Sequence, residues 1–402
     1  MKKIVYIFAV LLFVSVKASA QNPQLIIDDC VAPIGGKVAI AVKYNTEGKN
    51  YSGVNFNIDL PEGLSYEVDS KGNVVATIDN SNSGFTPVTS SNGFAPFSAT
   101  DYLAGETGTL LTFVLNVASN LSKDQELTCN VRNIAFTSAE GTKISLEPFT
   151  FVVKTSDKWV LDENSAALPV VSSAPVDILV KRTIKANQWS TICLPFDMTK
   201  AQVEEVFGSD VKIAFFDADN GGVVKVTGNP VESIEVEFKS YNYVDGLLYG
   251  CSPYLIRTSQ DISEFEVKAQ IYIDEEYLTA EYTAGSRPKK TYGFYGKLAA
   301  GTVIPENGLF LSGNEFWYST GKTVMKGFRG YFQFTDVVPK SSSAKVTFIV
   351  DGEATSIDGM NIKYAVDGVY DLSGRKIQLK DGDLNKLQKG VYIIDGKKVT
   401  IK

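Results

Sequence analysis

Apolar residues alternate with polar ones along several short runs, and this pattern constrains the fold more than any other feature. The clearest runs are Val38 to Tyr44, Val54 to Leu60 and Leu111 to Val117, each with an apolar side chain at every second position. A period of two is that of a β-strand with one buried face. Turn-forming residues such as Asp69 to Asn73 separate the runs. Residues 22–154 therefore predict an antiparallel β-sandwich.

The middle of the chain is also predicted to be mostly β. Alternating runs recur between residues 177 and 352. Thr199 and Gln202 form a capping-box pattern that predicts one short helix ending at Gly208. Residues 155–176 are rich in Asp, Ser, Ala and Pro without periodicity, which predicts a linker or a strand that crosses between domains.

Three two-residue turns mark the last segment: Asp367-Gly368, Ser373-Gly374 and Asp395-Gly396. Each separates short strand-like runs, which is a strong signal for β-hairpins. Residues 353–402 therefore predict a small β-meander. The expected fold class is all-β, with two sandwich-like domains in tandem, this meander and one short helix.

The first 20 residues are typical of a signal peptide. Lys2 and Lys3 precede an apolar run from Ile4 to Val16, and Ala18-Ser19-Ala20 follows it. A membrane span needs roughly 20 apolar residues, and no later stretch approaches that length. We therefore expect a soluble mature chain, starting near Gln21, that is exported to the cell surface (outer membrane) or the extracellular medium.

Export to an oxidising compartment bears on the four cysteines. Cys30 and Cys129 lie in the first predicted domain and Cys193 and Cys251 in the second, so two intradomain disulfides are candidates. The alternative is that all four are buried thiols. Cys30 lies too far from the cleavage site to carry a lipid anchor.

The chain contains no histidine, and this excludes catalysis or metal binding that depends on an imidazole. A carboxylate pair of the glycosidase type remains open, because its two acids need only meet in space. The acidic clusters Glu204-Glu205 and Asp274 to Glu276 do not form such a pair by their spacing, since neighbouring side chains point apart.

Metals and nucleic acids are not expected as ligands. The segment Asp217 to Gly222 lacks the spacing of an EF-hand, with Gly228 where a bidentate Glu is needed. A net charge of −7 with interspersed signs offers no basic stripe for a phosphate backbone. No metal, cofactor or nucleic acid is therefore predicted.

The first part resembles a known superfamily. The stretches GGKVAIAVKY (35–44), YSGVNFNIDLPEGLSYEVD (51–69), GETGTLLTFVLNV (105–117) and VRNIAFTSAEGTKISL (131–146) resemble strands of cohesins and carbohydrate-binding modules. The resemblance implies a jelly-roll sandwich that binds a protein module or a polysaccharide without chemistry.

Two further resemblances point to secreted Bacteroidota proteins. NQWSTICLPF (187–196), CSPYLIR (251–257) and GFRGYFQF (327–334) resemble an uncharacterised β module recurrent in them. VYDLSGRKI (369–377), KGVYII (389–394) and GKKV (396–399) resemble their C-terminal sorting modules. Such modules usually open with a proline-asparagine-proline segment, whereas this chain has no proline after Pro339, so a simple closing β module is the alternative.

Aromatic side chains are the candidate ligand contacts, because they combine a large apolar face with, in Tyr and Trp, a polar tip. The candidates are Tyr292, Phe294, Tyr295, Trp317, Tyr318, Phe85, Phe94 and Phe97. The alternative is that they fill the cores of β-sheets.

We expect a non-catalytic exported binding protein of the adhesin or carbohydrate-binding type, with a polysaccharide or another surface protein as partner. A carboxylate-dependent glycoside hydrolase or lyase, and a structural component of a surface assembly, are the alternatives.

Overall fold

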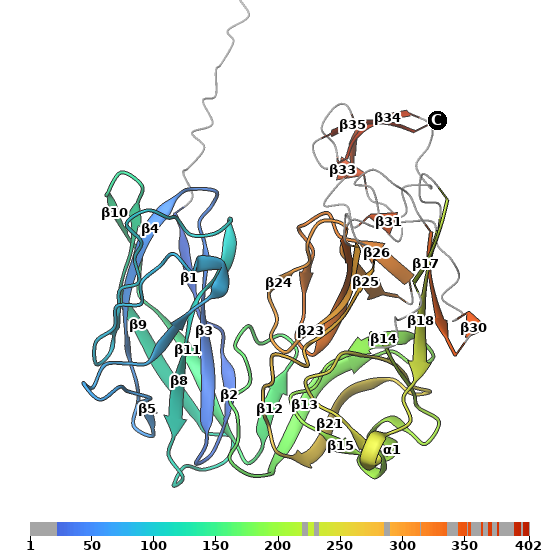
Figure 1. Cartoon of the computed structure of the whole chain (residues 1–402). Coiled ribbons are helices and arrows are strands. Elements are labelled where there is room, and N and C mark those ends of the chain that lie inside the picture. Colours follow the sequence, from blue (N-terminus) through green and yellow to red (C-terminus); the bar gives the residue numbers. More distant parts are fainter. Residues whose placement is uncertain are drawn as a thin grey trace, which may run out of the picture.

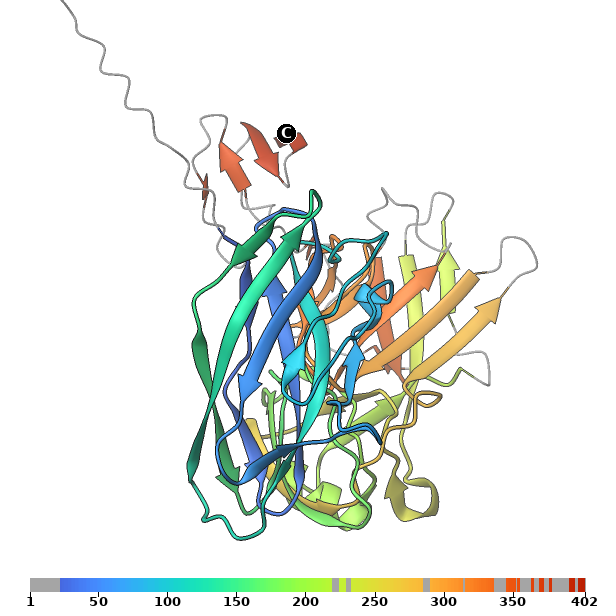
Figure 2. The same cartoon turned by 90° about the vertical axis from the view of Figure 1, so that its left-hand side faces the viewer.

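The computed structural model describes residues 22–218, 224–228, 233–284, 290–313, 315–335, 345–351, 353–354, 363–364, 369–371, 376–377, 390–394 and 397–401. Strands are the main element of these residues, with α1 as the one α-helix among them (Figures 1 and 2). The prediction of an all-β chain with one short helix is confirmed. The predicted signal peptide, residues 1–20, lies outside the described residues, as do the three predicted turns of the last segment.

The first part is a sandwich of two sheets. One sheet has the order β1-β3-β8-β5, with β6 also pairing β8. Its strands are β1 (Gln24–Ile26), β3 (Lys37–Asn45), β5 (Leu64–Tyr66), β6 (Ala76–Ile78) and β8 (Thr107–Val117). The other sheet has the order β2-β11-β9-β4-β7, with β10 also pairing β9. Its strands are β2 (Cys30–Pro33), β4 (Tyr51–Asp59), β7 (Gly93–Phe94), β9 (Glu126–Ser138), β10 (Lys143–Ser145) and β11 (Phe149–Ser156).

The alternation seen in the sequence separates core from surface in this sandwich. Val42, Phe56 and Phe113 are among the inward side chains and are at most 1% exposed. They belong to one apolar core between the sheets. The chain crosses from the first sheet to the second at Asp28 and Asp29, and β2 then pairs in parallel with β11.

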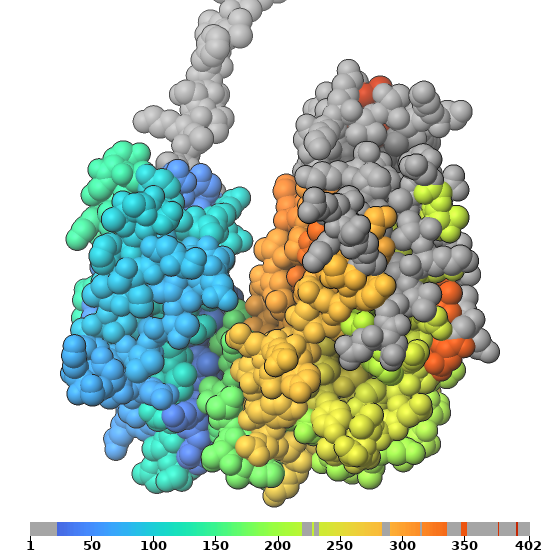
Figure 3. All heavy atoms as spheres, in the orientation of Figure 1, coloured from blue at the N-terminus to red at the C-terminus, as the bar shows by residue number. Residues whose placement is uncertain are grey.

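The segment predicted as a linker or crossing strand contains strand β12 (Trp159–Asp162). It pairs in parallel with β13 (Val176–Ile184), which pairs in turn with β21 (Ile262–Ala269). Figure 3 shows two lobes that meet at the base of the molecule, and Figure 1 shows β2 and β12 side by side there.

Glu163 fixes the end of this segment to the second lobe. Its carboxylate is almost fully buried and lies 3.5 Å from Arg182, 2.7 Å from Arg329 and 3.2 Å from Lys326. Arg182 is fully buried and also donates to the carbonyl groups of Phe328, Thr183 and Thr191. Buried charges are tolerated when paired and hydrogen-bonded in this way.

The second lobe is built around two larger sheets. One has the order β14-β20-β16-β18-β29-β30, with β17 pairing β18, and the other has the order β22-β23-β28-β25-β26-β31. The strands of the first are β14 (Trp189–Ile192), β16 (Lys212–Phe215), β17 (Val224–Thr227), β18 (Ser233–Ser240), β20 (Tyr254–Arg257), β29 (Lys345–Val350) and β30 (Glu353–Ala354). Those of the second are β22 (Thr279–Ala284), β23 (Lys290–Lys297), β25 (Leu309–Ser312), β26 (Glu315–Tyr318), β28 (Arg329–Thr335) and β31 (Lys363–Tyr364).

Stacked aromatic rings join the two larger sheets. Phe316 and Phe348 lie 3.9 Å apart between ring centroids, and Phe238 contacts Phe294 edge to face at 6.0 Å. Two short ladders complete the lobe: β15 (Met198–Thr199) with β19 (Leu247–Leu248), and β24 (Thr302–Val303) with β27 (Val324–Met325).

The predicted helix is present as α1 (Lys200–Phe207). Thr199 and Gln202 form the reciprocal capping box, and Gly208 at φ 94° follows the last turn. Val203 and Phe207 are the buried residues of the helix. No helix in the described part of the chain is long and apolar enough to cross a bilayer.

The last segment forms an antiparallel sheet of four short strands in the order β33-β32-β34-β35. These are β32 (Val369–Asp371), β33 (Lys376–Ile377), β34 (Gly390–Ile394) and β35 (Lys397–Ile401). The order differs from that of a simple meander, because β34 pairs with β32 instead of β33.

The four cysteines are thiols in this structure. Cys30 and Cys129 lie on opposite sides of β11, opposite Val153 and Phe151. Two strand spacings of about 4.8 Å separate them, so a disulfide, which needs Cα atoms roughly 4.4–6.8 Å apart, requires backbone movement. Burial raises the pKa of the Cys193 thiol, and the neighbouring Cys251 raises it further. Both pairings stay predictions.

Candidate binding surface

The eight predicted aromatic contacts fall into two groups by burial. Five lie in the cores, at most 5% exposed: Phe85, Phe94, Tyr292, Phe294 and Tyr318. Tyr295 and Trp317 are half-buried, and Phe97 is 48% exposed. A ligand can reach only these last three.

Tyr295 and Trp317 belong to the face of the β22–β31 sheet that points away from its core. Tyr295 lies opposite Tyr331 with the rings stacked at 5.3 Å, and Trp317 lies opposite Phe310. The hydroxyl of Tyr295 donates to the carboxylate of Glu281. Tyr331 and its neighbours form a small core of their own with the β24–β27 ladder, which leaves little of this face open.

Phe97 occupies a more open position on the first sandwich. Its N–H donates to the carbonyl oxygen of Thr86 at 3.2 Å, and its carbonyl accepts from Thr86 N–H at 2.7 Å. On its other side it pairs with Gly53 of β4. Gly53 has no side chain that could cover the phenyl ring. A Cβ atom added to Gly53 would lie 3.6 Å from the Cβ atom of Phe97. The phenyl ring is therefore held by the sheet but faces solvent.

Polar side chains continue this face along β4. Because alternate residues of a strand share a face, Asn55, Asn57 and Asp59 lie on the same side as Gly53. Asn133 Nδ2 donates to Asn57 Oδ1 at 3.1 Å, and Asn57 Nδ2 donates to Asn92 Oδ1 at 3.3 Å. These bonds join three segments of the chain into one amide network.

The network ends in a charged pair. Asn92 Nδ2 donates to Asp59 Oδ1 at 3.2 Å, and Arg132 donates to both oxygens of Asp59, from Nη2 at 2.8 Å and from Nε. Both charged side chains are 43% exposed. The Arg132 hydrogen bond holds the pKa of Asp59 below its ordinary value, so an ionised carboxylate and a guanidinium are both available to a ligand.

We call this face, defined by Phe97, Asn55, Asn57, Asn92, Asn133, Asp59 and Arg132, the outer β4 face. The six residue steps from Gly53 to Asp59 span about 20 Å at the rise of an extended strand. It presents an apolar ring at one end, amides along the middle and a charged pair at the other end. Such a surface can bind a ligand through stacking and hydrogen bonds.

Most of the outer β4 face was not predicted. The alternation in β4 puts Asn55, Asn57 and Asp59 on the solvent side, and this signal was available in the sequence. Asn92 and Arg132 come from distant segments, and only the pairing of β4 with β7 and β9 brings them there.

A glycosidase general acid needs a raised pKa. The pKa values of Asp59, Glu163 and Asp261 are lowered instead.

No family model and no curated protein matches this sequence. Among solved structures, similar chains are cohesin modules. A non-cellulosomal cohesin from Archaeoglobus fulgidus is 13% identical with a TM-score of 0.26, over 34% of this chain and 91% of that chain. The sixth cohesin of scaffoldin B from Acetivibrio cellulolyticus, in complex with a dockerin, is 14% identical with a TM-score of 0.27, over 34% and 100%. A type III cohesin of the ScaE scaffoldin from Ruminococcus flavefaciens is 16% identical with a TM-score of 0.27, over 34% and 88%. These values do not establish a relationship.

Proposed function

We propose that this protein is a non-catalytic, exported glycan-binding protein, and that the outer β4 face of the first sandwich holds the glycan. The observation that carries the proposal is the exposed ring of Phe97 on the same sheet face as a continuous row of amide, carboxylate and guanidinium groups.

The chemistry of this face matches that of a sugar chain. A pyranose ring offers apolar C–H groups on its faces, which suit an aromatic ring, and hydroxyl groups at its edge that both donate and accept. Asn amides supply donors and acceptors, Asp59 supplies acceptors and Arg132 supplies donors. These side chains already bond to one another, so binding costs less conformational entropy than it would for free side chains.

The location of the protein is part of the proposal. The signal-peptide pattern and the resemblance of the last segment to sorting modules support display at the cell surface or release to the medium. A protein partner in place of a glycan is the main alternative within the same class of non-catalytic binding modules.

A glycan array with the chain from Gln21 onward, carrying defined plant and mucin oligosaccharides, tests the proposal. Titration calorimetry with the best ligand then compares Phe97→Ala with the native chain. We expect roughly tenfold weaker binding, since stacking on an aromatic ring is worth on the order of 1 kcal/mol beyond the area it buries. Arg132→Lys, which breaks the bidentate pair, is expected to weaken binding as well.

The matched control is Tyr277→Ala. This aromatic residue is 60% exposed and lies on the second lobe. Its removal should leave glycan affinity unchanged. Failure to bind any oligosaccharide, or an equal loss in Phe97→Ala and Tyr277→Ala, would contradict the proposal.

A further inference from the structure

Three strand edges meet in a groove where the two lobes join. Strand β3 pairs with β8 along its whole length but with β1 only at residues 43–45. In the described chain β2 pairs only with β11, and β12 pairs only with β13. The groove between these edges has a volume of about 640 Å³, which is within the usual range for ligand sites.

The backbone groups that face the groove follow from the hydrogen-bond pattern. The carbonyl group of Gly36 accepts from Val117 N–H at 2.9 Å. In an antiparallel pair the bonded residues alternate, so Val38 and Ile40 also bond to β8. The N–H and C=O groups of Lys37, Ala39 and Ala41 therefore point to the free edge, where no strand of the described chain pairs with them.

The middle of this edge, beyond Lys37, lacks the usual protection against pairing. Natural edges carry prolines, bulges or inward charges that prevent strand addition. Here Ala39 and Ala41 have small side chains, and the bulge of the β3–β8 pair lies beyond them, between Val42 and Lys43. Unpaired backbone groups beside small side chains form a template for an added strand.

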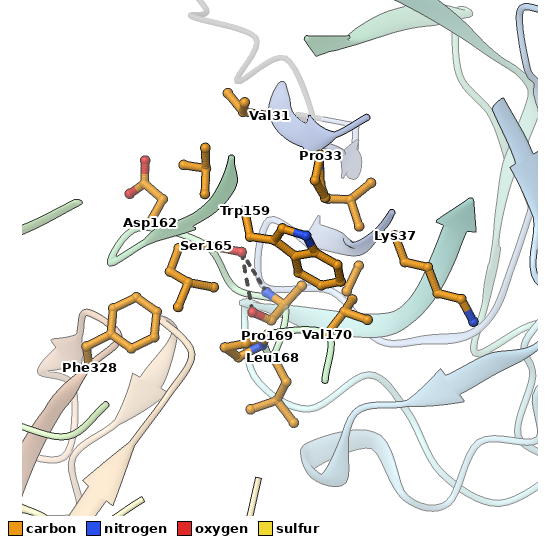
Figure 4. A pocket seen from close by; sticks show the side chains of 15 residues that line it. Val31, Pro33, Lys37, Trp159, Asp162, Ser165, Leu168, Pro169, Val170 and Phe328 are labelled. Carbon is orange, nitrogen blue, oxygen red and sulfur yellow. Dashed lines mark hydrogen bonds between the residues drawn. The ribbon is translucent and has the colours of Figure 1, made fainter. Parts of the chain in front are cut away.

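One end of the groove is closed by an aromatic side chain. Trp159 of β12 lies beside Pro33, as Figure 4 shows, and a Cβ on Gly36 would lie 3.1 Å from its ring. A small cavity of about 50 Å³ continues from the groove to Leu168 and Phe328. Trp159 therefore limits an added strand at the Gly36 end of the groove.

The charge of the groove favours a basic strand. Its lining includes four acidic residues and two basic ones: Asp28, Asp29, Glu126, Asp162, Lys154 and Lys181. Three ion pairs involve these residues: Lys154 with Asp124 at 2.9 Å, Lys181 with Asp162 at 3.9 Å, and Asp28 with Lys43 at 2.5 Å. Beyond these pairs the lining holds the carboxylates of Asp29 and Glu126, and cationic side chains on an incoming strand would complement them.

The chain itself contains such a strand. β35 has the sequence Lys-Lys-Val-Thr-Ile from Lys397 to Ile401, with two basic residues and three β-branched ones, which favour strands. It pairs with β34, and no strand among the described residues pairs with its other edge. Five residues span about 17 Å, and the unpaired edge of β3 runs over the six residues 37–42.

We propose that the free edge of β3 accepts β35 of a second copy of this chain by strand addition. The two surfaces differ, so the contact is heterologous and repeats from copy to copy, which gives an open chain of molecules unless a ring closes. This assembly is independent of glycan binding on the outer β4 face.

Light scattering after size-exclusion chromatography, over a range of concentrations of the chain from Gln21 onward, tests the proposal. We expect oligomers that grow with concentration. Ala39→Pro removes the edge N–H without removing a bond to β8, and should lower the apparent association constant at least tenfold. Ala39→Thr keeps the N–H and should assemble like the native chain.

The second arm tests the occupant and does not depend on the folding of a variant. A synthetic peptide with the sequence of residues 397–402 should slow deuterium uptake at Ala39 and Ala41 of the native chain, whereas the same peptide with its three lysines replaced by glutamate should not. Peptide protection together with concentration-dependent assembly supports the proposal. A protein that stays monomeric at all concentrations overturns the proposal. Assembly that is unchanged in the double variant Lys397→Glu/Lys398→Glu also overturns it, since another segment would then occupy the edge.

Discussion

Replacing Glu163 by Gln is expected to destabilise the second lobe strongly. The substitution keeps the shape of the side chain but removes the charge that faces Arg182, which is fully buried, and Arg329. Removing one partner of a buried ion pair costs roughly 3–5 kcal/mol, because the other charge stays buried without compensation. Arg182 keeps its bonds to three carbonyl groups, so we expect the lower end, about 3 kcal/mol.

Thermal unfolding followed by circular dichroism measures this cost. For a unit of 150–250 residues, 1 kcal/mol lowers Tm by roughly 2–4 °C, so the expected shift is about 6–12 °C. The matched control is Asp177→Asn, which removes the carboxylate of an exposed pair with Lys268 at 3.9 Å. Exposed pairs contribute about 0–1 kcal/mol. The reasoning is wrong if Glu163→Gln lowers Tm no more than Asp177→Asn does.

The same substitution should change the response to acid. Burial raises the pKa of Glu163, but Arg329 and Arg182, with hydrogen bonds from Arg329 and Lys326, outweigh it and hold the pKa below its ordinary value. A carboxyl group with a lowered folded pKa stabilises the fold above its unfolded pKa of about 4.3, and this contribution is lost as the pH falls through the folded value. The difference in unfolding free energy between native chain and Glu163→Gln should therefore shrink below about pH 4. A difference that is constant with pH would contradict the assignment.

Three further substitutions test the packing that positions the surfaces. Phe294→Ala should cost about 3–5 kcal/mol in chemical denaturation without altering glycan affinity, since its side chain is fully buried; a lost affinity in a folded variant would instead support a ligand role. Thr199→Ala should cost about 1 kcal/mol by removing the capping box of α1, and an unchanged denaturation midpoint would refute this. Gly296→Ala places a Cβ 2.6 Å from Cys193 Sγ and should lower the free energy of unfolding by roughly 1–3 kcal/mol. Adding Cys193→Ala to this variant should recover part of that free energy. If the effects of the two substitutions simply add, the contact is excluded.

The sequence predicts the strands of this protein well, because a half-buried strand has an apolar residue at every second position. Val38 to Tyr44 and Val54 to Leu60 fall in β3 and β4, although Leu60 itself lies just past the end of β4. The short helix was predictable for a similar reason, since the Thr199 capping box is a local interaction within four residues. Features that depend on neighbouring positions can be derived from the sequence.

Exposure of aromatic residues could not be derived in the same way. Phe94 and Phe97 lie three residues apart, yet Phe94 packs against Phe56 and Phe113 in the core and Phe97 faces solvent. Side chains three residues apart on a strand point to opposite faces of the sheet, but the sequence does not indicate which face packs against the core. The answer depends on the pairing with β4, about 40 residues upstream.

The connection between the lobes was the least predictable element, and it decides whether the groove beside β3 has a fixed width. Only Asp157 and Lys158 separate β11 from β12. Asp157 pairs with Lys123 of the sandwich at 2.9 Å, while Lys158 pairs with Glu266 of β21 in the second lobe. Five residues beyond Lys158, Glu163 is held by arginines far along the chain. A segment with the composition of a flexible linker is thus a short connection that contacts both lobes. The edges of β3 and β12 therefore face each other across a preformed gap. Binding of an added strand would not include the entropy cost of ordering these two edges.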